Sequence, residues 1–241
     1  MSGPTRASDR VAVVTGAGSG IGRAVCVRLA SAGWSLSLIG RRSEPIEETS
    51  RLCREAGAPR TMTLAAHVGR PADDARIVAS ARRDLGGFHV LVNNAGWAPV
   101  ASIDHHTPGV LDEVFAVNAL GPARLIALAW PVFAAQRRGC IVNVSSLATI
   151  DPFPGFFGYA AAKASLNLMA RSCAKEGASL GIRAFAVAPG AVETPMLRAN
   201  FTEQQVPASR CLTPDMVARV IVECIDGGRD GENGGTVVLR A

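Results

Sequence analysis

Residues 11–22 read Val-Ala-Val-Val-Thr-Gly-Ala-Gly-Ser-Gly-Ile-Gly, and this stretch decides the fold class. Its β-branched start predicts a buried strand, and the apolar pattern from about Gly20 to Ala32 predicts a helix. The glycines between them permit a tight turn and let the backbone approach a pyrophosphate closely. The helix N-terminus would add unpaired N–H groups and a positive dipole end. The stretch therefore predicts a phosphate-binding strand–turn–helix unit, and the alternative is an ordinary glycine-rich connection.

The rest of the chain continues the alternation of short apolar runs with amphipathic stretches. Strands are expected at 35–39, 61–66, 88–92, 140–144, 182–187 and 236–239, and helices at 44–56, 71–85, 108–135, 158–180 and 214–225. A bend is expected in the longest of these helices, at Gly121-Pro122. This order predicts an α/β fold in which helices cover both faces of a parallel sheet. We find no linker, so residues 1–241 are expected to form a single domain. The irregular stretch 188–213 is expected to be a lid, or else a disordered surface excursion.

Composition argues against several classes of protein. The formal net charge is +5, and 23 of the 25 basic residues are arginines, but they are scattered and no basic block occurs. We therefore expect no nucleic-acid partner. The six cysteines stand singly and the histidines form no metal-binding pattern, so no metal site is expected. Residues 1–10 lack the apolar core of a signal peptide, and no apolar run of membrane-spanning length is expected. These features predict a soluble cytoplasmic protein.

The chain's only tyrosine, Tyr159, precedes one of its two lysines, Lys163, by four residues. On a helix these two side chains share a face. An ammonium stabilises a phenolate, so Lys163 is expected to lower the pKa of the Tyr159 phenol. Such a phenol can exchange a proton with an alcohol or a carbonyl oxygen. The structural alternative is a core tyrosine next to a solvated lysine.

Three motifs in order give the chain a family resemblance. They are Thr15-Gly16-x-x-x-Gly20-x-Gly22, Asn93-Asn94-Ala95-Gly96 and Tyr159-x-x-x-Lys163. With them, the chain from about Arg10 onward resembles the short-chain dehydrogenase/reductase family, in its branch of about 250 residues. The resemblance implies a Rossmann-type doubly wound sheet of about seven strands in the order 3-2-1-4-5-6-7. It also implies hydride transfer between a nicotinamide and a small-molecule carbonyl or secondary alcohol, in a homodimer or homotetramer that pairs along the two long helices.

The resemblance also implies the roles of individual residues. Tyr159 would be the general acid or base, and Lys163 would tune it and bond the nicotinamide ribose. Ser146, thirteen residues before the tyrosine, would bind the substrate oxygen, with Ser145 the weaker candidate. Asn118 would hold a water that connects Lys163 to solvent. The implied cofactor contacts, besides Tyr159 and Lys163, are Gly16, Ser19, Gly20, Ile21, Gly22, Arg41, Arg42, His67, Val68, Asn94, Ala95, Gly96, Pro189, Gly190, Val192, Thr194 and Met196.

The residues after the second expected strand indicate which cofactor is bound. Arg41 and Arg42 stand where family members that prefer NAD carry an acidic residue. Arginine can form charge-assisted bonds to a 2′-phosphate. We therefore expect NADP(H) rather than NAD(H), with solvated loop arginines as the alternative. His67 replaces the family's usual aspartate, whose side chain meets the adenine amino group, and a neutral imidazole could still accept that hydrogen bond.

An aromatic run beside Ser146 indicates the kind of substrate. Phe153, Phe156 and Phe157, with Met196, Leu197 and Phe201 from the expected lid, favour a hydrophobic or aromatic compound; loop packing or a subunit contact is the alternative. A non-catalytic NADP(H)-binding regulator is the rival function. It would have no need to keep the complete Asn-Ser-Tyr-Lys set.

Overall fold

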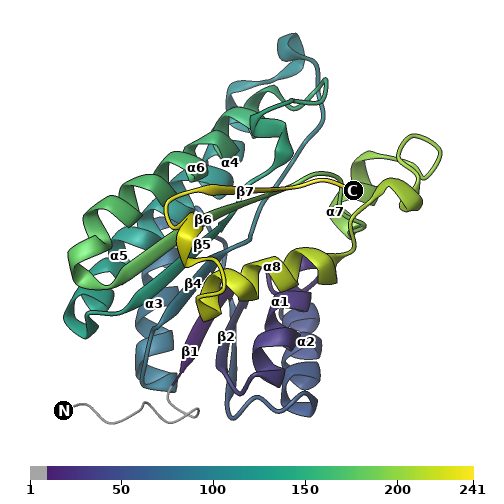
Figure 1. Cartoon of the computed structure of the whole chain (residues 1–241). Helices are drawn as coiled ribbons and strands as arrows, with labels where there is room; N and C mark the ends of the chain where they lie inside the picture. The colour runs from purple at the N-terminus through teal and green to yellow at the C-terminus, as the bar shows by residue number, and fades with distance from the viewer. Residues whose placement is uncertain (1–9) are drawn as a thin grey trace.

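The computed structural model describes residues 10–241 and forms one layered α/β body (Figure 1). The strands are β1 (Val11–Thr15), β2 (Ser35–Gly40), β3 (Thr61–Ala65), β4 (Val90–Asn93), β5 (Gly139–Val144), β6 (Ile182–Pro189) and β7 (Thr236–Leu239). The helices are α1 (Gly20–Ser31), α2 (Ser43–Glu55), α3 (Pro71–Leu85), α4 (Pro108–Phe115), α5 (Gly121–Gln136), α6 (Phe157–Gly177), α7 (Pro195–Asn200) and α8 (Pro214–Asp226).

The seven strands form one parallel sheet in the order β3-β2-β1-β4-β5-β6-β7, which confirms the expected topology. The chain winds outward from β1 in one direction through β2 and β3, and in the other through β4 to β7. Between β1 and β4 the direction of winding reverses. Ligands of such sheets bind outside the carboxyl ends of the strands at this switch point.

Two apolar cores lie on the two faces of the sheet. Val14 of β1 and Val142 of β5 face the core shared with α1, α2 and α8. Val13 and Ile141, their immediate neighbours, face the core shared with α3, α5 and α6. Successive strand residues point to opposite faces, so a strand buried on both sides needs an unbroken apolar run. Figure 1 shows the two helical layers on either side of the strands.

The long helix expected over 108–135 is divided. A π-helical turn, η3 (Ala116–Leu120), separates α4 from α5, so the irregularity lies just before the expected bend at Gly121-Pro122. The combined stretch Pro108–Gln136 is long and apolar enough to cross a membrane by length and composition, contrary to the expectation from sequence. Half of its most apolar window is buried inside the protein, as in a core helix.

The stretch 188–213 is more ordered than expected. Its first two residues complete β6, α7 occupies its middle, and Val192 forms a bridge with Leu212 that closes it into a loop. Phe201 near its centre is buried. The interpretation of this stretch as a disordered surface excursion is therefore wrong.

Candidate active site

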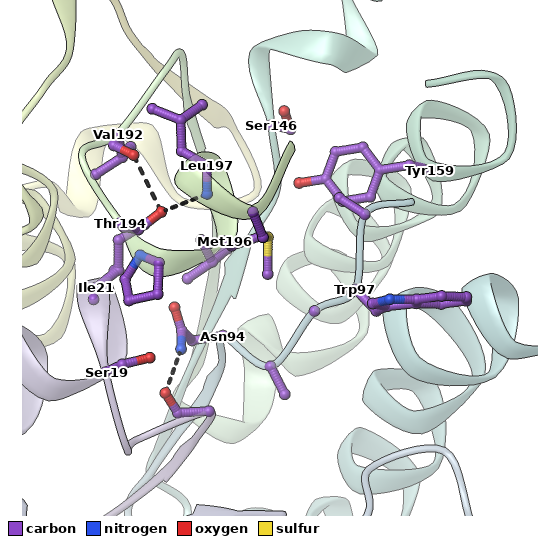
Figure 2. Close-up of a pocket in the computed structure, with 18 of the residues that line it drawn as sticks. Ser19, Ile21, Asn94, Trp97, Ser146, Tyr159, Val192, Thr194, Met196 and Leu197 are labelled. Atoms are coloured by element: carbon purple, nitrogen blue, oxygen red, sulfur yellow. Dashed lines mark hydrogen bonds between the residues drawn. The ribbon is translucent and has the colours of Figure 1, made fainter. Parts of the chain in front are cut away.

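A cavity of about 850 Å³ opens along the carboxyl ends of the strands, at the switch point of the sheet. Its wall includes Tyr159, Lys163 and Ser146, and nearly all of the cofactor residues expected from sequence: Gly16, Ser19, Gly20, Ile21, Arg41, Arg42, His67, Val68, Asn94, Ala95, Gly96, Pro189, Gly190, Val192, Thr194 and Met196. Of the predicted catalytic and cofactor residues, Gly22 and Asn118 do not line it. Segments up to about 180 residues apart in sequence thus meet around one space (Figure 2).

The glycine turn between β1 and α1 depends on the absence of side chains. Gly16 and Gly20 have φ of 66° and 51°, in the left-handed region that favours glycine. A Cβ on Gly22 would lie 2.2 Å from the Gly16 carbonyl oxygen, so Gly22 lets the helix pack on the turn. The Asn94 amide donates to the Thr15 carbonyl oxygen at 2.9 Å and holds the turn from the β4 side. Gly22 therefore lets α1 pack closely against the glycine turn.

The first turn of α1 is open to a ligand. Ser19 occupies the N-cap position without a side-chain hydrogen bond, so the first N–H groups of the helix have no capping side chain. A Cβ on Gly20 would lie 2.9 Å from Thr194 Cγ2, which shows how closely the stretch after β6 covers this turn. Open N–H groups at a helix N-terminus suit a phosphate. The cavity and this cradle fit a dinucleotide.

Arg41 and Arg42 follow β2 on the rim of the cavity. Both side chains are exposed, and neither forms an ion pair or a hydrogen bond with another side chain among residues 10–241. Arg23, by contrast, is held by bonds to Thr49 Oγ1 at 3.0 Å and to the Gly18 carbonyl oxygen at 2.6 Å. The two rim guanidinium groups are therefore available to an anion in the cavity.

Tyr159 and Ser146 meet at the inner end of the cavity (Figure 2). Tyr159, on the first turns of α6, is 9% exposed, and Ser146 follows β5. Burial raises the pKa of the Tyr159 phenol to about 12, while a hydrogen bond with the Ser146 hydroxyl acts in the opposite direction. Ser145 instead donates to the Lys163 carbonyl oxygen at 3.3 Å. Ser146 is therefore the serine that faces the phenol.

Lys163 lies one turn after Tyr159 on α6 and is 3% exposed. Its Nζ donates to the Val144 carbonyl oxygen at 2.7 Å and lies 5.8 Å from the centre of the Tyr159 ring. Burial lowers the pKa of Lys163 to about 8. The expectation that Lys163 brings the pKa of Tyr159 down is not met in this structure: burial raises the pKa of the phenol, and the opposing influence is the hydrogen bond with Ser146. The phenol is therefore held in its protonated form at neutral pH.

Asn118 lies in the π-helical turn and is fully buried. Its Nδ2 donates to the Val114 and Trp97 carbonyl oxygens at 2.9 and 2.8 Å, and its Oδ1 accepts from the Trp97 N–H at 3.2 Å. An interior π turn leaves backbone groups that such an amide can satisfy. A Cβ on Gly96 would lie 3.0 Å from Asn118 Oδ1 and 3.4 Å from Lys163 Nζ, so the amide lies near the lysine. The side chain of Asn118 thus fixes the loop after β4; its role in a water relay stays a prediction.

Aromatic rings form the wall beside the phenol. Phe156 lies 5.2 Å from the Tyr159 ring, and Phe201 lies 5.2 Å from Phe153 in an edge-on contact. These three phenylalanines line the cavity, but Phe157 and Ile150 do not and are 50% and 57% exposed. Trp97 and Asp151 also line this end. Sequence reasoning missed both, although Trp97 directly follows the Asn-Asn-Ala-Gly motif and that position was a signal.

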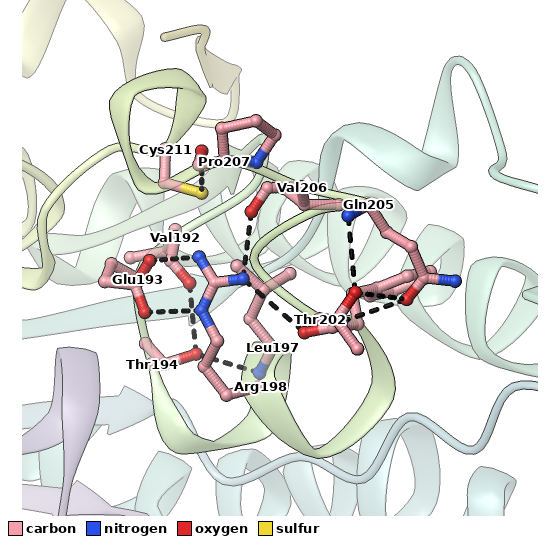
Figure 3. A network of polar contacts seen from close by, with 11 residues as sticks. Val192, Glu193, Thr194, Leu197, Arg198, Thr202, Gln205, Val206, Pro207 and Cys211 are labelled. Atoms are coloured by element: carbon pink, nitrogen blue, oxygen red, sulfur yellow. Dashed lines mark hydrogen bonds and ion pairs between the residues drawn. The ribbon is translucent and has the colours of Figure 1, made fainter.

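The stretch that follows β6 is braced by one arginine (Figure 3). Arg198 pairs with Glu193 through two hydrogen bonds, one of them 2.7 Å from Nε to Oε1, and donates to the Val206 carbonyl oxygen at 2.9 Å. Thr194 caps α7 by accepting from the Leu197 N–H at 3.2 Å. These contacts hold Met196, Leu197 and Phe201 against the cavity.

Comparisons with known proteins agree with this geometry. Residues 10–205 match the family described as short chain dehydrogenase. A 2-(R)-hydroxypropyl-CoM dehydrogenase of Xanthobacter autotrophicus is 36% identical over 191 residues, which are 78% of this chain and 76% of that protein. The crystal structure of a levodione reductase has a TM-score of 0.89 at 28% identity and covers 96% of both chains. A 3-ketoacyl-(acyl-carrier-protein) reductase from Brucella melitensis complexed with NADH has a TM-score of 0.88 at 27% identity, also over 96% of both chains.

The family match covers most of the chain. Residues of the glycine turn, of the Asn-Asn-Ala-Gly motif and of Tyr159-x-x-x-Lys163 all line one cavity. Members of this family are oxidoreductases that bind a nicotinamide cofactor and act on C–OH and C=O groups. Among residues 10–241, no three His, Cys, Asp or Glu side chains group as metal ligands. The chain belongs to the short-chain dehydrogenase/reductase family.

Proposed function

We propose that this protein is an NADP(H)-dependent carbonyl reductase whose substrate is an apolar or aromatic ketone or aldehyde. The observation that carries the proposal is the meeting of Ser146, Tyr159 and Lys163 at one end of a cavity whose other end is the glycine turn of α1. In this proposal residues 1–241 act as one domain, and the 188–213 stretch acts as the lid of the substrate end.

The protein's own groups support proton donation. The bound nicotinamide would supply the hydride. The Ser146 hydroxyl can hold the substrate oxygen, and the Tyr159 phenol, protonated at neutral pH, donates its proton to that oxygen as negative charge develops on it. Lys163, with a pKa of about 8, keeps enough proton at neutral pH to stabilise the resulting phenolate. This distribution of protons favours reduction over alcohol oxidation near pH 7.

Two arginines on the rim support the choice of NADP(H). The end of the second strand in such folds lies beside the adenosine ribose, and an arginine there accommodates a 2′-phosphate. Arg41 follows β2 directly, with Arg42 next to it, and neither is held by another side chain of the described residues. Among the described residues, Asp151 is the one carboxylate that lines the cavity, and it belongs to the substrate end, so no carboxylate of the cavity wall near Arg41 would repel the phosphate.

The charges at the substrate end support an uncharged substrate. Phe153, Phe156 and Phe201 offer apolar surface. Among the described residues there, Asp151 is the one charged side chain that lines the cavity besides Lys163. A carboxylate or sulfonate on the substrate would meet Asp151 with like charge and no arginine to offset it. Neutral aromatic carbonyl compounds are therefore expected to react faster than anionic ones.

The remaining expectations are part of the same proposal. All six cysteines are free thiols, as a reducing cytoplasmic compartment permits. Exposed apolar side chains on η3, α5 and α6, such as Leu120, Leu128 and Leu168, support a homodimer or homotetramer along the two long helices. The rival function, a non-catalytic NADP(H)-binding regulator, is disfavoured by a phenol and a buried lysine that cofactor binding alone would not need.

Reduced-nicotinamide absorbance tests the proposal. Wild-type protein is assayed with NADPH and NADH across neutral and anionic aromatic ketones, aldehydes, quinones and secondary alcohols. We expect turnover with NADPH that Tyr159→Phe abolishes while NADPH affinity stays within a fewfold of wild type. Arg41→Ala should weaken NADPH binding by about tenfold, which is the contribution of one charge-assisted contact, and leave NADH binding unchanged. Retained turnover in Tyr159→Phe would contradict the role of Tyr159 as proton donor. Equal weakening of NADPH and NADH binding in Arg41→Ala would contradict the role of Arg41 in binding the 2′-phosphate.

A further inference from the structure

Asp151 is a polar residue in the otherwise apolar wall of the substrate end. It lines the cavity and is exposed. Its backbone N–H donates to the Leu147 carbonyl oxygen at 3.0 Å, which continues the short 3-10 turn η4 (Leu147–Thr149) that follows Ser146. Its carboxylate has no hydrogen bond or ion pair with any of residues 10–241. The turn therefore fixes the backbone of Asp151 and leaves its carboxylate oxygens open to a ligand.

The wall around this carboxylate offers aromatic surface and no donor side chain. Phe201 contacts both Phe153 and Phe156 edge-on, with ring centres 5.2 and 6.0 Å apart. All three rings line the cavity together with Asp151. A substrate that packs against the rings is therefore brought up to the carboxylate.

The cations of the cavity wall are engaged or distant. Arg41, Arg42 and His67 follow β2 and β3, on the opposite half of the sheet from β5, which precedes Asp151. Lys163 is buried, and its Nζ donates to the Val144 carbonyl oxygen. A carboxylate that is removed from water without a partner carries a large desolvation cost. A substrate that covers Asp151 therefore has to bring its own donor.

The exposure of the wall indicates which end of the substrate meets Asp151. Tyr159 is 9% exposed and faces Ser146 at the inner end of the cavity (Figure 2). Phe153, two residues after Asp151, is 55% exposed and lies toward solvent. With the carbonyl group between the hydroxyls of Ser146 and Tyr159, the end of the substrate remote from the carbonyl lies at the more open part of the wall.

We propose that Asp151 is a specificity-determining residue that selects substrates with an O–H or N–H donor at the end remote from their carbonyl group. An ionised carboxylate can only accept, so the donor has to come from the substrate. A hydroxyl would supply a charge-assisted hydrogen bond, and an ammonium would add charge pairing and contact with the aromatic faces. The inference rests on the proposed reductase function. The alternative is that Asp151 only keeps the mouth of the cavity hydrated.

Steady-state reduction of matched aryl ketones by the full chain with NADPH distinguishes these alternatives. The ring of each ketone carries a hydroxymethyl, an aminomethyl or an ethyl group, para or meta to the carbonyl group, so that size is similar and the donor differs. Wild type should show a roughly three- to tenfold higher kcat/KM for the hydroxymethyl ketone than for the ethyl ketone, the range of one hydrogen bond at an open site. The difference should lie in KM, because a contact remote from the carbonyl is made equally in the ground state and the transition state.

The aminomethyl ketone identifies which donor the site suits. A larger preference for it than for the hydroxymethyl ketone would assign the selection mainly to charge pairing, and equal preferences would assign it to the hydrogen bond itself. Both results support selection by Asp151.

Two variants of Asp151 and one control locate the preference. Asp151→Leu should bring both ratios to the ethyl ketone close to one. Asp151→Asn, whose amide oxygen still accepts, should keep part of the hydroxymethyl preference and lose most of the aminomethyl preference. Glu203→Gln is the matched control, because Glu203 is an exposed carboxylate of the stretch after β6 that does not line the cavity. Its ratios should equal those of wild type.

A donor preference that survives in Asp151→Leu, or that falls equally in Glu203→Gln, would overturn the inference. Equal wild-type kcat/KM for the three ketones would overturn it as well, while Tyr159-dependent reduction of all three would still support the proposed function. If wild type reduces none of them, the proposed function and the inference both fall. Thermal unfolding of each variant separates loss of fold from loss of preference.

Discussion

Lys163 is a buried cation whose environment disfavours its charge. Its Nζ has the Val144 carbonyl oxygen as its hydrogen-bond partner, with no carboxylate paired to it among residues 10–241. A pKa lowered from 10.5 to about 8 means that the protonated form is destabilised on folding. Each pKa unit corresponds to about 1.4 kcal/mol, so the charge costs a few kcal/mol of stability at neutral pH. Such a cost is typical of a residue kept for chemistry.

We therefore predict that Lys163→Met raises the free energy of unfolding at pH 7 by about 1–3 kcal/mol while turnover is lost. Between pH 8 and 10.5 the unfolded chain holds a proton at this position that the folded chain has released. Deprotonation of Lys163 should therefore raise the free energy of unfolding of the wild type as the pH rises through this window. The difference in free energy of unfolding between Lys163→Met and the wild type should shrink accordingly. The Tyr159 phenol acts oppositely above pH 10, because its folded pKa of about 12 exceeds the unfolded one. Urea unfolding at pH 7 and pH 9 measures the difference; an advantage that does not change with pH would contradict it.

The behaviour of elements is clearest in the stretch around α7. This helix has six residues, too few to be stable alone, and none of them is buried. The stretch is held instead by the cap of Thr194, the Val192–Leu212 bridge and the contacts of Arg198. A segment stabilised by a few polar contacts can open at a small free-energy cost, as a lid must.

Arg198→Ala should loosen this lid without unfolding the protein. We expect faster proteolysis within 193–212 and a severalfold higher KM for an apolar ketone, because Phe201 and Leu197 would no longer be held against the cavity. Affinity for NADPH should fall less than affinity for the ketone, since the glycine turn and Arg41 are untouched and only Val192, Thr194 and Met196 of this stretch are expected cofactor contacts. Arg210→Ala is the control: it removes an exposed arginine of the same segment whose side chain has no partner among the described residues. Equal proteolysis of the two variants would show that Arg198 does not brace the lid.

On the scale of the whole molecule, the helical layer of α4, α5 and α6 carries apolar side chains that the chain itself does not cover. Leu168 on α6 is 63% exposed and Leu120 on η3 is 51% exposed. Exposed apolar groups gathered on one layer are typical of a surface that binds another copy.

Leu168→Glu should therefore shift the protein toward a single chain of 25.0 kDa, because a carboxylate would be buried unpaired in the contact. Met216→Glu, which places the same charge on the exposed side of α8 in the opposite layer, should leave the assembly unchanged. Light scattering after size exclusion measures both masses. A wild-type protein that is already a single chain would refute the proposed interface.

The sequence by itself determined the order of the elements, the parallel sheet and many of the residues that line the cavity. It could do so because strand and helix periodicity, glycine turns and the Tyr159-x-x-x-Lys163 spacing are local properties, which the backbone expresses wherever the element finally packs. The family resemblance carried by the local motifs supplied the strand order.

Only the tertiary structure decided how those residues are tuned. Burial, set by distant segments, raised the pKa of Tyr159 against the expected influence of Lys163. Asn118 bonds Trp97, and His67 meets Glu113, through contacts between parts of the chain that have no common local signal. Desolvation and hydrogen-bond partners are properties of the packed molecule, because they depend on which elements enclose a group, and no spacing along one element contains that information.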